Sequence, residues 1–417
     1  MARTLFLPIL ALLISAALLN LGNGLQFTLL PIRADGAAFD DLLIGLITSG
    51  YFVGFLLGCW LGPKMIGNVG HIRIIAAAFA VLAAFMLAYP LVIDAWAWSG
   101  ARLISGFALA VAYMAIESWL NECTHDSARG TVLSVYTLIA LVMLGCGQFL
   151  INLYDPWGFE LFSVSAIAVA LAVVPVALTR APAPTSSPHA NLRLAGLRDL
   201  PRTSVLGCVI VGLSNSAFWG FGPVFGARIG LSTGEIGAFM AVVMFGGAAM
   251  MWPIGRLSDR VDRRGVIAVA SLATAVAAMG IVFVAQGSLV WLLAGGFLFG
   301  AFSMTIYPIS LAHANDSAQA TDFVQISGAL LFVFGASSFL GPVIVAVLMK
   351  GVGPEAVFLF IAAVHVAGTL LAFLFQYLRA PVLAAEKEDF LMVPRTTQEA
   401  FQLHEPEADE PAPAKMG

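Results

Sequence analysis

Two ionisable side chains lie inside long apolar runs of the chain, where a charge is costly. Arg102 lies in the sequence ARLISGF, and Glu117 is the only acid well inside an apolar run. If these runs cross a membrane, such charges are expected to mark a pathway for ions or substrates. Arg102 could bind an anionic solute or serve coupling, or it could pair with an acid at the outer side. Fifteen residues of helix would place the two charges about 22 Å apart, so they cannot pair with each other.

The carboxyl of Glu117 has two interpretations. It could take up and release a proton as its surroundings change, because burial disfavours the charged form of a carboxyl. It could instead pair with a basic side chain near the same end of its helix, for which the sequence offers Arg73, His71 and Arg129. The first interpretation makes Glu117 a coupling residue, and the second makes it structural.

A second set of charges is concentrated in the stretch GRLSDRVDRRG, residues 255–265, of a chain that is only 11% charged. A basic loop of a membrane protein is retained on the cytoplasmic side, so these charges can hold its topology.

The composition indicates which kind of secondary structure positions Arg102, Glu117 and the charged stretch. Hydrophobic residues make up 60% of the chain and the mean hydropathy is +0.94, far above the usual globular range of about 45–50% apolar. A helix needs roughly 20 apolar residues to cross a bilayer, and a β-barrel would show short alternating segments instead. The sequence therefore predicts an all-α membrane protein.

Charges, Gly/Pro clusters and polar loops divide the chain into twelve apolar spans. The opening run is too long for a signal peptide and carries Asn20, Asn23 and Gln26, so it counts as the first span. The first six spans lie at about 5–32, 42–62, 72–93, 95–120, 130–152 and 158–179, and the other six at about 203–227, 233–254, 265–286, 288–312, 322–348 and 355–379. This division predicts an N-terminal six-helix bundle (1–179), a linker (180–202), a C-terminal six-helix bundle (203–379) and a tail (380–417).

The placement of basic residues predicts the orientation, because Lys and Arg are retained on the cytoplasmic side. With both termini inside, sixteen of the twenty Lys and Arg residues lie in cytoplasmic segments, and only Arg33, Arg228 and Lys350 lie outside. The net charge of -4 comes from the tail, whose own net charge is -5. This charge and the five prolines of the tail predict a disordered cytoplasmic extension. The sequence therefore predicts a multi-pass protein of the bacterial inner membrane with both termini in the cytoplasm.

The two halves resemble each other. Five positions of the first two spans recur 192 residues later, including Asn23 as Asn215 and Gly54 as Gly246. In the fourth span Gly106 recurs 194 residues later as Gly300. Six spans in each half make the repeats parallel, which predicts a pseudo-two-fold axis along the membrane normal and a cavity between the halves.

These residues resemble those of the major facilitator superfamily. GRLSDRVDRRG is similar to that family's signature loop and takes the second of its two equivalent places, whereas the first, GPKMIGNVGHIR, has Ile66 where the acid would be. ESWLNE and ARGTVLSVY are similar to the YcaD-like branch. The antiporter signature of the fifth helix is missing, since the chain has MLGCGQFLI there. The resemblance implies the major facilitator fold, but not a particular substrate.

The resemblance also implies roles for single residues. Asp259 would cap the start of the helix that begins near Gly130, and Arg260 would pair with Asp316, which together would latch the cytoplasmic face shut. The candidate gate residues are Gly255, Asp259, Arg260, Arg263, Arg264 and Asp316. The alternative is that these charges only hold topology. In this family the first, fourth, seventh and tenth helices line the cavity, where amides and aromatic side chains contact a substrate. The alternative for such polar groups is hydrogen bonding between helices. The candidate cavity residues are Asn23, Gln26, Tyr113, Asn215, Trp219 and Tyr307.

Together these features predict a secondary transporter that moves a small organic solute by alternating access, either by proton coupling or down the solute's own gradient. Arg102 and Glu117 favour an anionic or zwitterionic solute over a cation. A drug or metabolite efflux antiporter of the same fold, and a receptor or lipid-handling protein that transports nothing, are the alternatives. The four cysteines have no paired spacing and no phosphate-binding loop or metal cluster is recognisable, so no enzyme activity, cofactor, metal or nucleic-acid partner is predicted.

Overall fold

The computed structural model describes residues 2–179, 200–285, 287–316, 323–378 and 390, and the described part is helical. Within these described ranges, twelve helices are long and apolar enough to cross a membrane. The first six are α1 (Ala2–Gly36), α2 (Asp41–Val69), α3 (His71–Ala88), α4 (Ala95–Cys123), α5 (Asp126–Phe149) and α6 (Glu160–Ala177). The other six are α7 (Arg202–Arg228), α8 (Thr233–Arg260), α9 (Arg263–Val284), α10 (Leu289–Asn315), α11 (Phe323–Val352) and α12 (Ala356–Leu378). The predicted fold class is confirmed.

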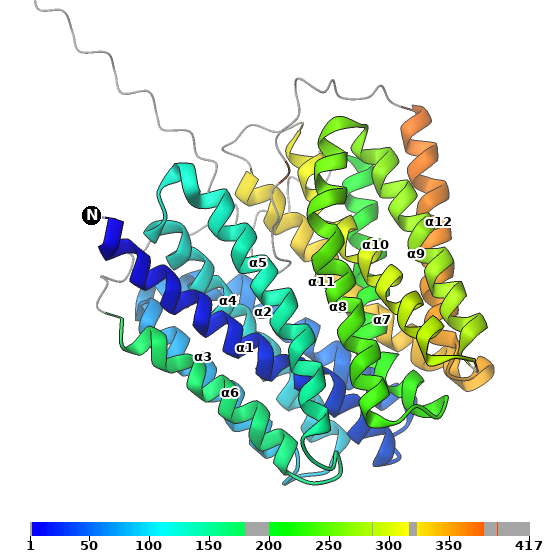
Figure 1. Cartoon of the computed structure of the whole chain (residues 1–417), viewed down its shortest axis with the longest axis horizontal. Coiled ribbons are helices and arrows are strands. Elements are labelled where there is room, and N and C mark those ends of the chain that lie inside the picture. The colour runs from blue at the N-terminus through cyan, green and yellow to red at the C-terminus, as the bar shows by residue number, and fades with distance from the viewer. Residues whose placement is uncertain (1, 180–199, 286, 317–322, 379–389, 391–417) are drawn as a thin grey trace, which may run out of the picture.

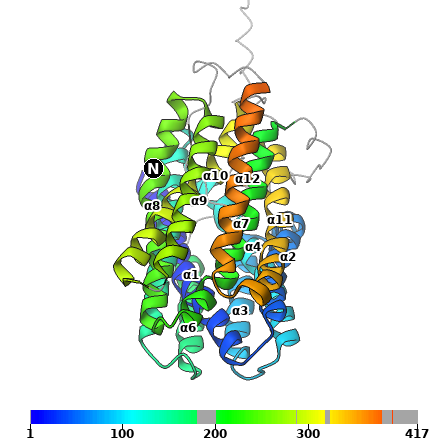
Figure 2. The ribbon, with the colours of Figure 1, turned by 90° about the vertical axis from the view of Figure 1, so that its right-hand side faces the viewer.

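The helices form two groups of six with the same internal packing. In the first group α2 packs on α4, α1 on α5 and α3 on α6, and in the second α8 packs on α10, α7 on α11 and α9 on α12. The groups meet along α2 and α11, α5 and α8, and α1 and α7. Figure 1 shows them close together at one end and diverging toward the other, and Figure 2 looks onto the second group from the side.

Glycines allow the closest helix contacts, and these contacts occur in pairs. A Cβ on Gly106 would lie 2.1 Å from the carbonyl oxygen of Tyr51, and a Cβ on Gly300 would lie 1.9 Å from that of Val243. Small residues of this kind let helix backbones approach within a membrane. The same backbone contact therefore holds α2 to α4 and α8 to α10.

Two sides of the bundle are named here for reference. The linker side is the one on which α6 and α12 end and α7 begins, and the opposite side carries the turns from α1 to α2 and from α7 to α8. The predicted tail, apart from Phe390, and the predicted linker, apart from residues 200–202, lie outside the described residues. α5 begins at Asp126, so Gly130 lies within this helix rather than at its start.

Candidate functional site

Arg102 lies in α4, which packs closely against α2, and its side chain is buried, with 2% of the residue exposed. Its guanidinium carbon lies 5.1 Å from the ring centroids of both Phe27 and Tyr51. Its Nε and Nη1 groups have no hydrogen-bond partner, and no carboxylate among the described residues lies within ion-pair distance of it. A buried cation of this kind is costly unless something pairs with it. The predicted structural pair with an acid at the outer side is therefore not formed here.

The rings next to Arg102 connect the two helix groups. Phe27 of α1 lies 4.8 Å, centroid to centroid, from Trp219 of α7, and it meets the Tyr51 ring edge-on at 5.4 Å. Trp219 is half-buried. The candidate cavity residue Trp219 and the candidate coupling residue Arg102 thus both lie close to the ring of Phe27. We refer to Arg102, Phe27, Tyr51 and Trp219 as the arginine cluster.

A second polar cluster lies closer to the linker side, within the first helix group. Tyr113 donates a hydrogen bond of 2.7 Å from its hydroxyl to Oδ1 of Asn20, and Asn23 lies within reach of the same hydroxyl. Tyr136 of α5 donates a bond of 3.0 Å to Oε1 of Glu117, whose side chain is fully buried. We refer to these residues as the carboxyl cluster. The structure therefore places Tyr113 about 16 Å and Glu117 about 22 Å along α4 from Arg102.

Two of the three basic side chains that the sequence offered to Glu117 make hydrogen bonds with neighbouring groups. The His71 Nε2 lies 2.6 Å from Oγ of Ser118, the residue after Glu117, and the Arg129 Nε donates to the carbonyl of Thr124 at 3.2 Å. Tyr136 contributes a phenol, a neutral donor, to the surroundings of Glu117. A phenol can donate to the ionised carboxyl and stay in place when the carboxyl gains a proton, which is compatible with a coupling role.

The remaining candidate cavity residues, Gln26, Asn215 and Tyr307, are buried and belong to neither of the two clusters. Gln26 in α1 and Asn215 in α7 each have one buried amide atom, Nε2 and Oδ1, without a hydrogen-bond partner. Tyr307 in α10 packs its ring on Phe334 at a centroid distance of 5.5 Å. Buried amide atoms without partners are uncommon in folded proteins. Gln26 and Asn215 therefore each keep one amide atom that could form a hydrogen bond with a solute, whereas the Tyr307 ring packs on an aromatic neighbour.

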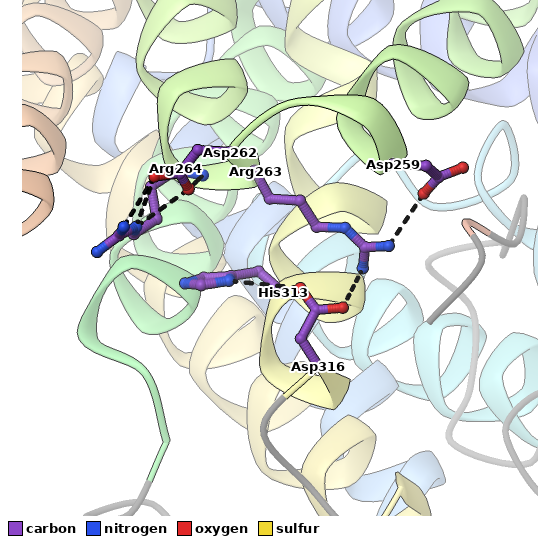
Figure 3. Close-up of polar contacts among 6 residues, drawn as sticks. All are labelled: Asp259, Asp262, Arg263, Arg264, His313 and Asp316. Carbon is purple, nitrogen blue, oxygen red and sulfur yellow. Dashed lines mark hydrogen bonds and ion pairs between the residues drawn. The ribbon is translucent and has the colours of Figure 1, made fainter. Parts of the chain in front are cut away.

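The charged stretch at 255–265 forms the turn from α8 to α9, and Figure 3 shows its pairs. Arg263 is fully buried and bridges Asp259 and Asp316, with nitrogen–oxygen distances of 3.0 Å to each. His313 Nδ1 lies 3.8 Å from the second oxygen of Asp316. The prediction that Arg260 pairs with Asp316 was therefore wrong. Arg260 is the last residue of α8 and points to solvent, whereas Arg263 is the first residue of α9 and turns inward toward α10.

Arg264 belongs to a separate pair in the same turn. Its Nη2 lies 2.8 Å from Asp262, which also caps the start of α9 by accepting from the backbone N–H of Arg264. Partial burial opposes ionisation of Asp262, but the hydrogen bonds from Arg264 outweigh it and hold the pKa of this carboxyl below its usual range. The pair fixes the turn that presents Arg263.

Salt bridges on the opposite side join the two helix groups. Arg228 at the end of α7 pairs with Asp35 at 2.8 Å and with Asp41 at 2.5 Å, and Lys350 at the end of α11 pairs with Asp40 at 3.2 Å. The N–H of Leu42, together with Lys350, lowers the pKa of Asp40. We refer to these five residues as the outer clamp. The clamp holds the ends of α1 and α2 to those of α7 and α11.

Replacing Arg228 by Ala should loosen the outer clamp without unfolding the protein. Each pair is partly exposed and contributes only about 0.2–1 kcal/mol, so the unfolding temperature should change little. Spin labels at Ala37→Cys and Val352→Cys, in a chain whose native cysteines are replaced, would report an increased population of long distances. An Arg256→Ala variant is the matched control, because Arg256 is exposed on the linker side. Unchanged distances in the Arg228 variant would show that the clamp does not hold the two groups together.

Phe27, Tyr51, Tyr136 and the acids of the outer clamp were missed by the sequence analysis. Only seven tyrosines occur in the chain, so a tyrosine inside an apolar span is a usable signal for Tyr51 and Tyr136. Phe27 carries no such signal, because phenylalanine is frequent in membrane helices and occurs thirty times. Asp35 and Asp41 are separated from Arg228 by 193 and 187 residues, so their pairing could not be read from spacing.

Comparison with known proteins gives two family matches, one in each half. The model described as "Major Facilitator Superfamily" matches residues 204–404, and the model described as "Sugar (and other) transporter" matches residues 12–184. The MFS-type transporter YcaD of Escherichia coli is 29% identical over 362 residues, covering 86% of this chain and 93% of that protein. The MFS-type transporter Ent638_1421 of Enterobacter sp. (strain 638) is 28% identical over 359 residues, with the same coverage.

Solved transporter structures have a similar fold. The nucleoside transporter NupG superposes with a TM-score of 0.72 at 14% identity, covering 88% of this chain and 98% of its own. A bacterial homologue of the human lysosomal transporter Spinster gives 0.73 at 14% identity, covering 91% and 97%. The human organic anion transporter MFSD10 gives 0.62 at 15% identity, covering 88% and 99%. At these identities the similarity concerns the fold alone.

Proposed function

The chain belongs to the major facilitator superfamily and is a membrane transporter of the bacterial inner membrane, and from this premise we propose that it carries a small organic anion or zwitterion by proton-coupled alternating access. The observation that carries the proposal is the buried guanidinium of Arg102. It has two N–H-bearing nitrogens without partners and no carboxylate in ion-pair reach among the described residues. An arginine in this state favours an anionic group, which it can bind with two parallel hydrogen bonds.

The surroundings of Arg102 support a solute with an apolar body. Phe27 and Tyr51 lie against the guanidinium, and Trp219 adds a third ring from the other helix group. Aromatic side chains provide contact area for an organic molecule at little conformational cost. Because Trp219 and Arg102 belong to different groups, a solute bound between them would contact both groups at once.

Alternating access is supported by the unequal ends of the bundle. The outer clamp joins the two groups on the opposite side, while they diverge toward the linker side (Figure 1). We assign the linker side to the cytoplasm because of the basic residues among the described ones. The helix ends and turns of the linker side carry Lys64, Arg73, Arg129, Arg202, Arg256, Arg260, Arg263 and Arg264, and those of the opposite side carry Arg33, Arg228 and Lys350. The structure then corresponds to a state that faces inward. A state that faces outward would require the outer clamp to open and the linker side to close.

The carboxyl cluster is the proposed proton site. Glu117 lies in the same helix as Arg102, so a shift of α4 as a rigid body would connect the two sites. Its hydrogen bond from Tyr136 crosses from α5 to α4, and a relative movement of these helices would change it. The protonation state of Glu117 would thus differ between the two conformations.

Replacing Glu117 by Gln should separate exchange from accumulation. The amide keeps the shape of the carboxyl but cannot release a proton, so uphill uptake driven by a pH gradient should fall by about tenfold or more, while exchange of solute across liposomes continues. Tyr136→Phe is the companion variant, because it removes only the hydrogen bond. Full pH-driven accumulation by Glu117→Gln would show that another group carries the proton.

A thermal-shift screen of the purified protein in detergent tests the substrate class. The panel contains organic anions, zwitterions, sugars and lipophilic cations. A ligand present at a hundred times its dissociation constant should stabilise the protein by about 2.7 kcal/mol. Shifts confined to anions or zwitterions, followed by uptake of the same compounds into liposomes, support the proposal. Shifts confined to lipophilic cations would favour an efflux antiporter, and binding without flux would favour a receptor.

A further inference from the structure

Phe390, a residue of the predicted tail, lies against the linker-side end of α8. Its backbone N–H donates a hydrogen bond of 3.0 Å to Oδ1 of Asp259, and its ring covers Gly255. A Cβ on Gly255 would lie 2.1 to 2.6 Å from three atoms of the ring, so the glycine makes room for it. Phe390 is half-buried and packs against the hydrophobic core of the bundle. Both of its α8 partners belong to the charged turn described above.

The face of α8 that Phe390 covers is the face that contacts α5 further along. Near the opposite side, Gln148 of α5 lies against Gly237, and the rings of Phe149 and Phe245 stack at a centroid distance of 6.3 Å. Gly255 follows Gly237 by eighteen residues, which is five full turns of an α-helix. The two glycines therefore lie on the same side of α8, one facing α5 and the other facing Phe390.

This placement has a consequence for closure of the linker side. α5 and α8 run between the same two sides and belong to different helix groups. If the groups rock together on the linker side, the first turns of α5 approach the end of α8. The ring of Phe390 already lies on that surface, and its N–H already binds the carboxylate of Asp259. Closure would then require Phe390 to leave.

We propose that Phe390 is a wedge, supplied by the chain's own tail, that docks on Gly255 and Asp259 and holds the transporter open on the linker side. The proposal rests on alternating access, as put forward under the proposed function. It assigns to the tail a regulatory role, since anything that removes Phe390 from α8 would favour closure. Besides its pair with Arg263, Asp259 would bind the Phe390 N–H in the open state and the start of α5 in the predicted closed state, and these two contacts would exclude each other.

The test is a distance measurement between the two helix groups, which needs no substrate. Spin labels at Thr131→Cys in α5 and Val261→Cys after α8 report the linker side, and both positions are exposed. Labels at Ala37→Cys and Val352→Cys report the opposite side. The native cysteines are replaced in the full-length chain, and the variants are Phe390→Ala and its neighbour Leu391→Ala as the control.

The expected result is a several-fold larger population of short linker-side distances in Phe390→Ala than in Leu391→Ala, with a matching increase of long distances on the opposite side. Identical distributions in the two variants, with both populations present, would overturn the wedge and leave alternating access intact. A single unchanged distribution on both sides in every variant would overturn the wedge together with alternating access. Because Phe390 is only half-buried and lies outside the twelve helices, its replacement should lower the unfolding temperature only slightly.

Discussion

Replacing Arg102 by Met should make the ligand-free protein more stable and at the same time abolish binding of anionic ligands. Removing a buried charge that has no carboxylate partner relieves a desolvation cost, and apolar replacements of buried ions have stabilised proteins by about 1–4 kcal/mol. Two charge-assisted hydrogen bonds of about 1.5 kcal/mol each would be lost from a bound anion, which corresponds to roughly 100-fold in affinity. Thermal unfolding with and without the ligand found in the screen measures both effects.

The opposite directions of these two effects distinguish a binding residue from a structural one. If Arg102 served the fold, its loss would lower the unfolding temperature. Arg102→Lys is the companion variant, because it keeps the charge but loses the planar fork that binds a carboxylate through two bonds, and should weaken binding about tenfold or more. A destabilised Arg102→Met protein that still binds the ligand would contradict the proposed anion site.

A methyl group at Gly106 should be among the most damaging single changes in the membrane region. In Gly106→Ala the new Cβ would lie 2.1 Å from the Tyr51 carbonyl oxygen and 2.9 Å from its carbon, both backbone atoms of α2. The helices must separate to accommodate it, at a cost of about 3 kcal/mol or more. Because Arg102 and Tyr51 are positioned by the same contact, ligand binding should fall as well. Unfolding temperature and the ligand-induced shift are the measurements.

Gly100→Ala is the matched control in the same helix. No atom lies within 4 Å of the position that its Cβ would occupy, so the change should be neutral or stabilise α4 by up to about 1 kcal/mol. Gly300→Ala and Gly280→Ala provide the corresponding pair in the second group, with a contact of 1.9 Å at Gly300 and nothing near Gly280. Equal stability of Gly106→Ala and Gly100→Ala would contradict the backbone contact.

The fold could be predicted from the sequence because a bilayer restricts both the length and the backbone hydrogen bonding of the segments that cross it. Long apolar spans must be helices, and their count, together with the recurrence of Gly54 and Gly106 as Gly246 and Gly300, predicted two equivalent groups of six. These glycines form the same contacts in each group, at carbonyl oxygens of the facing helix. The recurrence of these glycines is a strong signal because a helix backbone that lies against a carbonyl oxygen of the facing helix leaves no room for a side chain.

The candidate site could be predicted only where a residue is unusual for its surroundings. Arg102 and Glu117 were identified because a charge in an apolar span is rare. Phe27 was missed because a phenylalanine there is ordinary, although its ring joins Arg102 to Trp219. The pairing of Arg263 rather than Arg260 with Asp316 depends on where α8 ends and α9 begins, and helix ends are the least certain feature of a sequence-based prediction.

The exposure of the outer clamp has a further consequence, for the medium that surrounds the cell. Arg228, Lys350 and their acids are partly open to solvent, and attraction between such charges weakens as dissolved salt accumulates. The screening length falls from about 30 Å at 0.01 M ionic strength to about 3 Å at 1 M. The Arg263 pair is buried and is screened far less. With the linker side in the cytoplasm, as proposed above, external salinity would act on the outer clamp alone and would bias the resting conformation toward the state that faces outward.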